Sequence, residues 1–228
     1  MTTVADLVLS LADNKQLLGM RYAEWSSATP TLEADIAAAA MGLDDLGHAR
    51  VLYGCLTELD GDPRGPERDS DPASWRNVAF LDGSWTRWDQ FVAANAILDS
   101  AFTLVIEALV EGDVEILRTR LRKMLSEERF HHLHGKSWLK EGVDEAVVKE
   151  AERQAAVFLG PDDEVLPGTK LRAGQLRERL GVPQPRVDWK SWNPLRRRTE
   201  PGQIDARTFD MLTGLLEKRY NLASSRES

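Results

Sequence analysis

Two acid-x-x-His motifs constrain this chain most strongly, because each lies in a stretch whose apolar residues recur at helical spacing. Asp45 and His48 occur in "LDDLGH", and Glu128 and His131 occur in "SEERFH". Side chains three positions apart leave the same face of a helix, so each motif offers one carboxylate and one imidazole to a common point. A single pair of this kind is usually a solvated surface pair, but two pairs on separate helices favour a site for iron, manganese or zinc.

Helical spacing and its interruptions divide the chain. The sequence predicts helices over residues 4–25, 31–60, 88–111, 114–140 and 143–158. Pro30 and the Gly112-Asp113 pair mark two short turns, whereas residues 60–86 form a long connection rich in proline, glycine and charge. Two antiparallel hairpins joined by a long crossover are one connectivity of the all-α, ferritin-like four-helix bundle, which is the predicted fold.

The last part of the chain differs in composition. Residues 1–160 are predicted to form the bundle, and residues 161–228 are predicted to form an irregular extension with a late helix near 206–220. The extension is rich in proline, arginine and tryptophan. Trp189 and Trp192 are expected to pack on the bundle or on a partner subunit, because exposing them is costly.

Hairpin geometry indicates a third carboxylate for the site. Antiparallel helices bring together residues about equally far from their turn, so Asp99 is expected opposite Glu128. Asp99 lies in the apolar run "ANAILDSAFTLVI", where an unpaired buried carboxylate would be expensive. His132 and His134 point about 100° and 300° around the helix from His131, so they are expected at the surface or behind a ligand.

In the first hairpin, the partner of Asp45 is expected near residue 15. The candidates are Lys15 and Gln16, with Asp13 a turn earlier. If Lys15 points inward, its ammonium replaces a metal cation and forms a buried ion network with the carboxylates. Asp44, beside Asp45, either orients a ligating histidine or is a solvated acid. The sequence leaves these alternatives open.

Charge and cysteine content narrow the function. With 37 acidic and 29 basic residues the formal net charge is -8, which disfavours binding to nucleic acid or anionic membranes. The lone Cys55 excludes an internal disulfide, and because we recognise neither a leader nor a membrane span, we expect a soluble, cytoplasmic protein. The basic cluster Arg196, Arg197 and Arg198 is interpreted either as a solvated turn or as a patch for an anionic ligand or partner.

Several segments together resemble one family. They are "LLGMRYAEWSSATPTLEADIAAAAMGLDDLGHARVLYGCLTEL", "ILDSAFT", "SEERFHHLHG", "FLGPDDE" and "GQIDARTFDMLTG". They are similar to the phenylacetyl-CoA epoxidase subunits, ferritin-like proteins of a bacterial multicomponent oxygenase for phenylacetic acid catabolism. The family's catalytic subunit carries Gln-Asp-Glu-x-Gly-His and Glu-Glu-Ser-Phe-His, where this chain has "LDDLGH" and "SEERFH". By these motifs the chain resembles the catalytic subunit most, although it is shorter than we expect for that subunit.

The resemblance implies a carboxylate-bridged di-iron monooxygenase. It places the metal ligands at Asp45, His48, Asp99, Glu128, His131 and, for the helix-one glutamate, Gln16, with Asp45, Asp99 and Glu128 as catalytic carboxylates. The implied cofactor is two iron ions, with a single metal ion or manganese as alternatives. The implied partners are an aromatic acyl-CoA substrate, O2, a separate reductase and sister ferritin-like subunits in a homo- or hetero-oligomer. Phe102 and Phe130 are expected to wall the substrate pocket.

Departures from the family pattern keep three functions open. Neutral Gln16 removes a negative charge from a site that must offset two divalent ions, and Asp45 is one methylene shorter than glutamate. The chain is therefore interpreted as an oxygenase component. The first alternative is a structural subunit that supports a catalytic homologue, as a sister subunit of the family does. The second alternative is a ferritin-like metal store or oxidase that needs neither a CoA ester nor a reductase.

Overall fold

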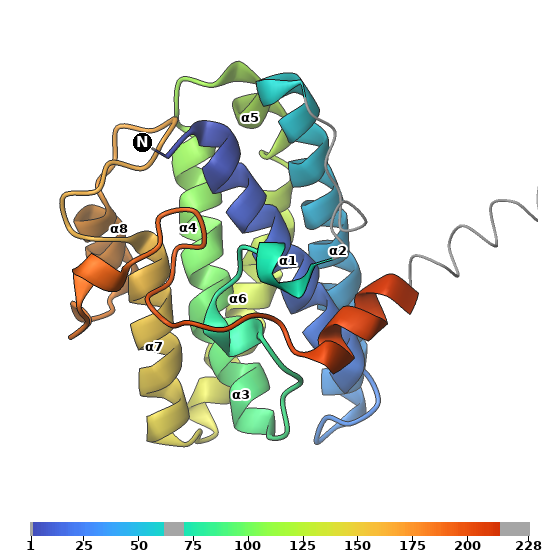
Figure 1. Cartoon of the computed structure of the whole chain (residues 1–228). Helices are drawn as coiled ribbons and strands as arrows, with labels where there is room; N and C mark the ends of the chain where they lie inside the picture. The colour runs from blue at the N-terminus through green and yellow to red at the C-terminus, as the bar shows by residue number, and fades with distance from the viewer. Residues whose placement is uncertain (1, 62–70, 215–228) are drawn as a thin grey trace, which may run out of the picture.

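A computed structural model describes residues 2–61 and 71–214, and every regular element in this part of the chain is a helix (Figure 1). The first hairpin consists of α1 (Val4–Trp25) and α2 (Leu32–Asp60). The third rod runs through α3 (Trp88–Ala93), η4 (Ala94–Leu98) and α4 (Asp99–Val110). The fourth rod consists of α5 (Glu115–Arg120) and α6 (Met124–Lys140). The predicted all-α, ferritin-like bundle is confirmed.

Capping residues set the ends of the first hairpin. The Thr3 hydroxyl accepts a hydrogen bond from the Asp6 N–H, while the Asp6 carboxylate accepts one from the Thr3 N–H, which is a capping box at the start of α1. Thr31 caps α2, as its position before the alanine-rich run predicts. Gly61 ends α2 in the left-handed conformation, with φ 75°.

Two helices that the sequence predicts as continuous are interrupted. η4 is a π-helical turn directly before Asp99, and such turns often occur where a helix re-aims side chains into a site. The helix predicted over 114–140 breaks between Arg120 and Met124. Neither a glycine nor a proline marks either interruption, so the sequence signals for helix ends miss both.

Two glycine contacts bring the rods together near the middle of the bundle. A Cβ on Gly19 would lie 2.9 Å from the carbonyl oxygen of Gly42, so α1 and α2 approach backbone to backbone. A Cβ on Gly135 would lie 2.7 Å from the Cα of Ala96, so α6 packs directly on η4. The polar side chains of the candidate site lie within about one helical turn of these contacts, which therefore fix their positions.

The described part of the crossover lies on α1. Its short helices are η2 (Pro72–Ser74) and η3 (Ala79–Leu81). The Asn14 side chain accepts a hydrogen bond from the Val78 N–H at 2.9 Å, and the Asp13 carboxylate accepts one from the Arg76 N–H at 2.9 Å. The connection predicted over 60–86 is thus held to the first helix, although its residues 62–70 lie outside the described part.

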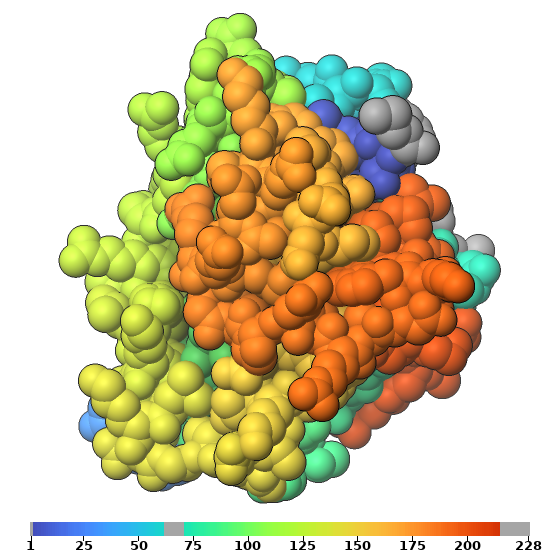
Figure 2. Space-filling view, turned by 90° about the vertical axis from the view of Figure 1, so that its left-hand side faces the viewer, coloured from blue at the N-terminus to red at the C-terminus, as the bar shows by residue number. Residues whose placement is uncertain are grey.

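The C-terminal segment covers one side of the bundle. Its elements are α7 (Glu145–Leu159), α8 (Ala173–Leu180), η5 (Trp189–Ser191) and a helical segment at 206–214. Figure 2 shows this segment spread over the side formed by α7. The Trp192 indole donates to the carbonyl of Val157 at 3.0 Å, as expected for a tryptophan packed on the bundle. The sequence did not predict α8, and residues 215–220 of the predicted late helix lie outside the described residues.

Both interpretations of the arginine cluster are wrong for two of its members. The buried Arg197 guanidinium donates to the carbonyls of Phe158 and Leu159, both at 2.6 Å, at the C-terminal end of α7. The Arg198 guanidinium donates to both carboxylate oxygens of Asp82, each at 2.8 Å. These cations satisfy buried acceptors and neutralise the negative helix end, instead of facing solvent or an external anion.

One stretch of the described chain passes the length and composition test for a membrane span. Residues 88–110 form an apolar run of 23 residues, which corrects the expectation that no such run exists. However, 78% of its apolar window is buried inside the bundle, as expected for a core helix. This stretch is weak evidence for a membrane segment.

Candidate metal centre

The four rods bring their polar side chains together in the middle of the bundle. Six of these side chains are each at most 3% exposed: Lys15, Asp45, His48, Asp99, Glu128 and His131. Ligand atoms from four of them lie within 4.8 Å of one another, so these four could hold a metal ion: Asp45, Asp99, Glu128 and His131. The structure thus gathers the five acids and histidines that the sequence singled out, together with one lysine.

Lys15 supplies a positive charge at the centre of this cluster. Its ammonium donates to Asp45 Oδ1 at 2.9 Å and also contacts Asp99 Oδ1 and Glu128 Oε1. Burial alone would lower the pKa of Lys15, but the three carboxylates outweigh it and raise the pKa well above its usual value. Lys15 is therefore protonated at neutral pH and has no lone pair to offer a metal.

Lys15, not Gln16, occupies the helix-one position. Gln16 is only half-buried and takes no part in the hydrogen bonds that Lys15 makes at the cluster. Adjacent residues on a helix point about 100° apart, so only one of the two faces the centre. Asp13 is engaged elsewhere, since its carboxylate accepts a hydrogen bond from the Tyr53 hydroxyl at 2.7 Å. The expectation that Gln16 fills this position is corrected to Lys15.

Asp99 is held by donors from three rods. Besides Lys15, the Tyr22 hydroxyl donates to Asp99 Oδ2 at 3.2 Å, and His131 Nδ1 lies 3.0 Å from the same oxygen. This agrees with the predicted register, which places Asp99 beside the second acid-x-x-His motif. Asp45 is less well satisfied, because its Oδ2 is buried without a hydrogen-bond donor in the described part of the chain.

Glu128 is ionised by its surroundings. The Thr103 hydroxyl donates to Glu128 Oε2 at 2.8 Å, and His48 Nδ1 lies 2.8 Å from Oε1. Burial alone would raise the pKa of Glu128, but Lys15 and His48 lower it to about 2. Its carboxylate therefore accepts contacts from three of the four rods at neutral pH.

Each histidine of the cluster also contacts an acid on its outward side. His48 Nε2 lies 2.8 Å from Glu127 Oε2, and His131 Nε2 lies 3.5 Å from Asp44 Oδ2. Burial alone would lower both pKa values, but contacts with the buried carboxylates raise the pKa of His48 to about 10 and that of His131 to about 9. Both imidazoles are therefore protonated at neutral pH and act as donors.

These residues do not fit a pair of divalent ions. Three basic side chains face three acidic ones, so the cluster is formally neutral without a metal. A histidine binds a metal through a neutral ring nitrogen, whereas both imidazoles are charged in this network. The Lys15 ammonium already contacts the three carboxylates that would have to bridge or bind two ions. Among the described residues of the cluster, the unpaired Asp45 Oδ2 is the feature that favours a further cation.

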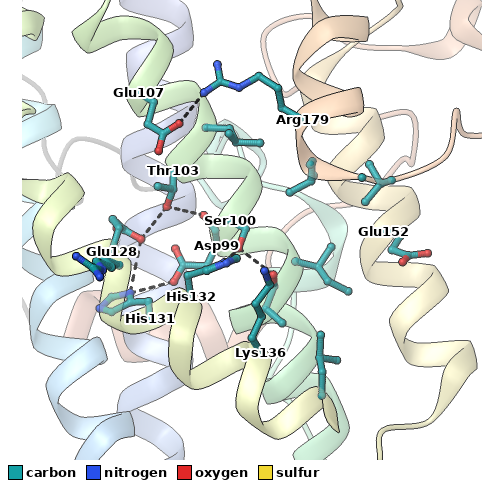
Figure 3. A pocket seen from close by; sticks show the side chains of 18 of the residues that line it. Asp99, Ser100, Thr103, Glu107, Glu128, His131, His132, Lys136, Glu152 and Arg179 are labelled. Atoms are coloured by element: carbon teal, nitrogen blue, oxygen red, sulfur yellow. Dashed lines mark hydrogen bonds and ion pairs between the residues drawn. The ribbon is translucent and has the colours of Figure 1, made fainter.

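A groove opens beside the cluster between α4, α6, α7 and α8 (Figure 3). It has a volume of about 680 Å³, within the usual range for small-molecule sites, and Asp99, Glu128 and His131 reach its inner wall. Arg179 of α8 bridges one end by an ion pair with Glu107 of α4, at 3.0 Å. The groove gives the polar cluster a lateral connection to the outside of the bundle.

The predicted aromatic walls of this pocket are wrong. Phe102 is fully buried and packs edge-on against Phe158, with ring centroids 4.8 Å apart. Phe130 is 71% exposed on the outer side of α6. Neither residue lines the groove, whose apolar walls come from aliphatic side chains such as Leu104 and Leu125.

The two remaining histidines lie outside the cluster, as helical spacing predicts. His132 lines the groove, with Nδ1 3.1 Å from the Ser100 hydroxyl. His134 Nδ1 lies 2.9 Å from Asn95 Oδ1, while its Nε2 accepts a hydrogen bond from the Trp138 indole at 3.1 Å. Burial and the neighbouring positive charge of His131 lower the pKa of His134 to about 4, so it is neutral.

Comparisons with known proteins agree with the sequence motifs and the bundle. A family model described as Phenylacetic acid catabolic protein matches residues 1–158. One of the subunits of the 1,2-phenylacetyl-CoA epoxidase of Escherichia coli (strain K12) is 28% identical over 141 residues, which cover 61% of this chain and 57% of that protein. The match therefore spans little more than half of that relative. This chain belongs to the phenylacetic acid catabolic protein family.

Proposed function

We propose that this chain is a structural subunit, without a metal of its own, of a multicomponent oxygenase related to 1,2-phenylacetyl-CoA epoxidase. The relative is named as a subunit of such an epoxidase, which supports a role in a complex. The observation that carries the proposal is the Lys15 ammonium in contact with Asp45, Asp99 and Glu128. A protonated lysine in that position supplies the charge that metal ions would otherwise supply.

The polar cluster then acts as a positioning device. Removing charges from water costs several kcal/mol per ion, so a buried network is kept only when each charge finds partners. Here the partners come from all four rods, and each contact is directional. The cluster therefore fixes the mutual positions of the rods and of their outer faces, which a catalytic partner would recognise.

A di-iron oxygenase component is the second candidate. Four acid and histidine side chains with ligand atoms within 4.8 Å of one another favour it, as does the unpaired Asp45 Oδ2. This function, with O2, an aromatic acyl-CoA and a separate reductase, requires the Lys15 side chain to leave the cluster. A ferritin-like metal store or oxidase carries the same requirement.

Metal analysis separates these functions. The protein is reconstituted anaerobically with iron, desalted, and analysed for iron and manganese per chain, beside a Lys15→Glu variant and a control with the exposed Lys190→Glu. The structural role predicts no stoichiometric metal in the wild type or the control, and uptake by Lys15→Glu, whose carboxylate restores an acidic centre. Stoichiometric iron in the wild type would overturn the proposal in favour of the oxygenase or the metal store.

A further inference from the structure

Exposed apolar side chains are unevenly distributed over the described residues. Eight large hydrophobic side chains are exposed, and six of them lie on α2 and α6: Leu32, Ile36, Leu43, Val51, Phe130 and Leu133. The other two, Val165 and Leu195, lie singly in the C-terminal segment. Single exposed hydrophobics are ordinary, but a cluster on adjoining helices marks an interaction surface. We call these six residues the α2–α6 face.

α2 is apolar on two opposite sides. Its inner side carries the buried cluster residues and a packed core, which explains why that side is inward. Leu32, Ile36 and Leu43 follow one another at helical spacing on the outer side, with the exposed Ala39 and Ala40 between them. A helix that is apolar all round is normally covered all round. The outer side of α2 therefore lacks a covering element in the described part of this chain.

α6 extends this surface. Phe130 and Leu133 are 71% and 55% exposed, and they flank the residue His131 of the polar cluster. The ion pair between His48 and Glu127 joins α2 to α6 directly beneath the face. The two apolar groups therefore belong to helices that the buried network holds side by side.

The opposite side of the bundle is already covered. Figure 1 shows α2 at one edge and α7 and α8 at the other, and Figure 2 shows the C-terminal segment spread over the α7 side. This segment packs through buried contacts such as those of Arg197 with the end of α7. The face without a cover is thus the one that carries the exposed apolar residues.

The shape and charge of the face indicate its occupant. From Leu32 to Val51 it extends about 30 Å along α2, which suits a long helix better than a small molecule or a turn. Ala39, Ala40 and the partly exposed Gly47 allow a second helix to approach closely. Arg50 has no ion-pair partner within residues 2–61 and 71–214, so it calls for an acidic side chain on the partner.

A second copy of the chain matches this face poorly. The acids nearest its middle are Asp44 and Glu127, and both already contact histidines of the cluster. A second copy would therefore offer Arg50 no free carboxylate from the middle of the same face. A chain with formal net charge -8 also repels an identical copy.

We propose that the α2–α6 face docks a long helix of a related ferritin-like subunit, whose apolar ridge fills the face and whose acidic residue pairs with Arg50. The proposal rests on the proposed structural role and names the surface that serves it. The helix would also cover the outward acids Asp44 and Glu127, which strengthens their contacts with His131 and His48 by excluding water.

The test uses exposed residues, so the variants retain the fold. Leu43→Asp and Phe130→Asp are made in the full chain, with Leu195→Asp as a matched exposed apolar control on the C-terminal segment. The probe is the purified family member from the same source that carries a carboxylate at the position of Lys15. Binding is measured by calorimetry, and circular dichroism with urea unfolding verifies the fold of each variant. Each face variant should weaken binding about 30-fold or more, and the control should bind as the wild type does.

The outcomes separate this proposal from the proposed function. If the wild type binds and both face variants bind equally well, the α2–α6 face is the wrong surface while the structural role stands. If the wild type does not bind this subunit, both proposals fail. If the chain alone forms a dimer that Leu43→Asp dissociates, the occupant is a second copy and the proposal is overturned.

Discussion

The Lys15 ammonium lies 2.9 Å from Asp45 Oδ1, and neither side chain has exposed surface. This pair joins α1 to α2 about one turn from the backbone contact between Gly19 and Gly42. The close approach of the two helices brings the ammonium within reach of the carboxylates of the other rods. The acid-x-x-His motifs therefore frame a cluster whose central cation is an amino acid side chain.

Replacing Lys15 with methionine should destabilise the fold. The change leaves three buried acids facing two histidines, and breaking a buried ion network costs about 3–5 kcal/mol. Gln16→Met is the matched control on the half-buried neighbour, with an expected change below about 1 kcal/mol. Urea unfolding at neutral pH measures both. A Lys15→Met protein as stable as the control would show that the lysine contacts contribute nothing.

Stability should fall on the alkaline side. The pKa values of His48 and His131 are raised in the fold to about 10 and about 9, so their stabilisation is complete below the unfolded value near 6.5. It is lost as the pH rises through about 9 and then about 10. The expected loss is several kcal/mol between about pH 6 and pH 10, measured by urea unfolding.

The histidine variants check the origin of this slope. A His48→Gln, His131→Gln double variant should lose most of the alkaline dependence, whereas His132→Gln, in the groove outside the cluster, should keep it. An equally steep slope in the double variant would assign the pH dependence to other groups.

Arg197 should anchor the C-terminal segment. Arg197→Met leaves the buried carbonyls of Phe158 and Leu159 without their donors, at an expected cost of about 2–3 kcal/mol. The exposed Arg186→Met is the control. Thermal unfolding measures the loss, and limited proteolysis should show faster cleavage in residues 161–214 only for Arg197→Met. Equal cleavage of both variants would contradict the anchoring role.

Gly135 should fix the position of α6. An added methyl at Gly135 would lie 2.7 Å from the backbone of Ala96, so Gly135→Ala should force α6 away from η4 at a cost of about 1–3 kcal/mol. Gly54→Ala meets nothing within 4 Å and should stabilise α2 by up to about 1 kcal/mol. Urea unfolding of the pair tests whether this close contact sets the helix packing. Two changes of the same sign would contradict it.

Local signals in the sequence predict much of the fold and most members of the cluster. Caps such as Thr31 and Gly61 mark helix ends, and hairpin register places Asp99 beside Glu128 because antiparallel helices count equally from their turn. The same register points to residue 15 but cannot choose between neighbours, because the choice depends on the rotation of α1 on α2. The Gly19–Gly42 contact decides that rotation in favour of Lys15.

Features that depend on distant partners escape the sequence. Arg197 and Arg198 read as a basic surface cluster, because the carbonyls and the carboxylate that bury them come from α7 and the crossover. Phe130 reads as a pocket wall, because spacing on one helix does not say which side faces a neighbour. The π-turn η4 leaves no composition signal, although it directly precedes Asp99.

The most direct test of the central claim is the metal content of the wild-type chain after anaerobic reconstitution with iron. The account predicts no stoichiometric iron, because Lys15 already balances Asp45, Asp99 and Glu128. Stoichiometric iron bound by the wild type would contradict it, and would mean that Lys15 leaves the cluster to admit a metal.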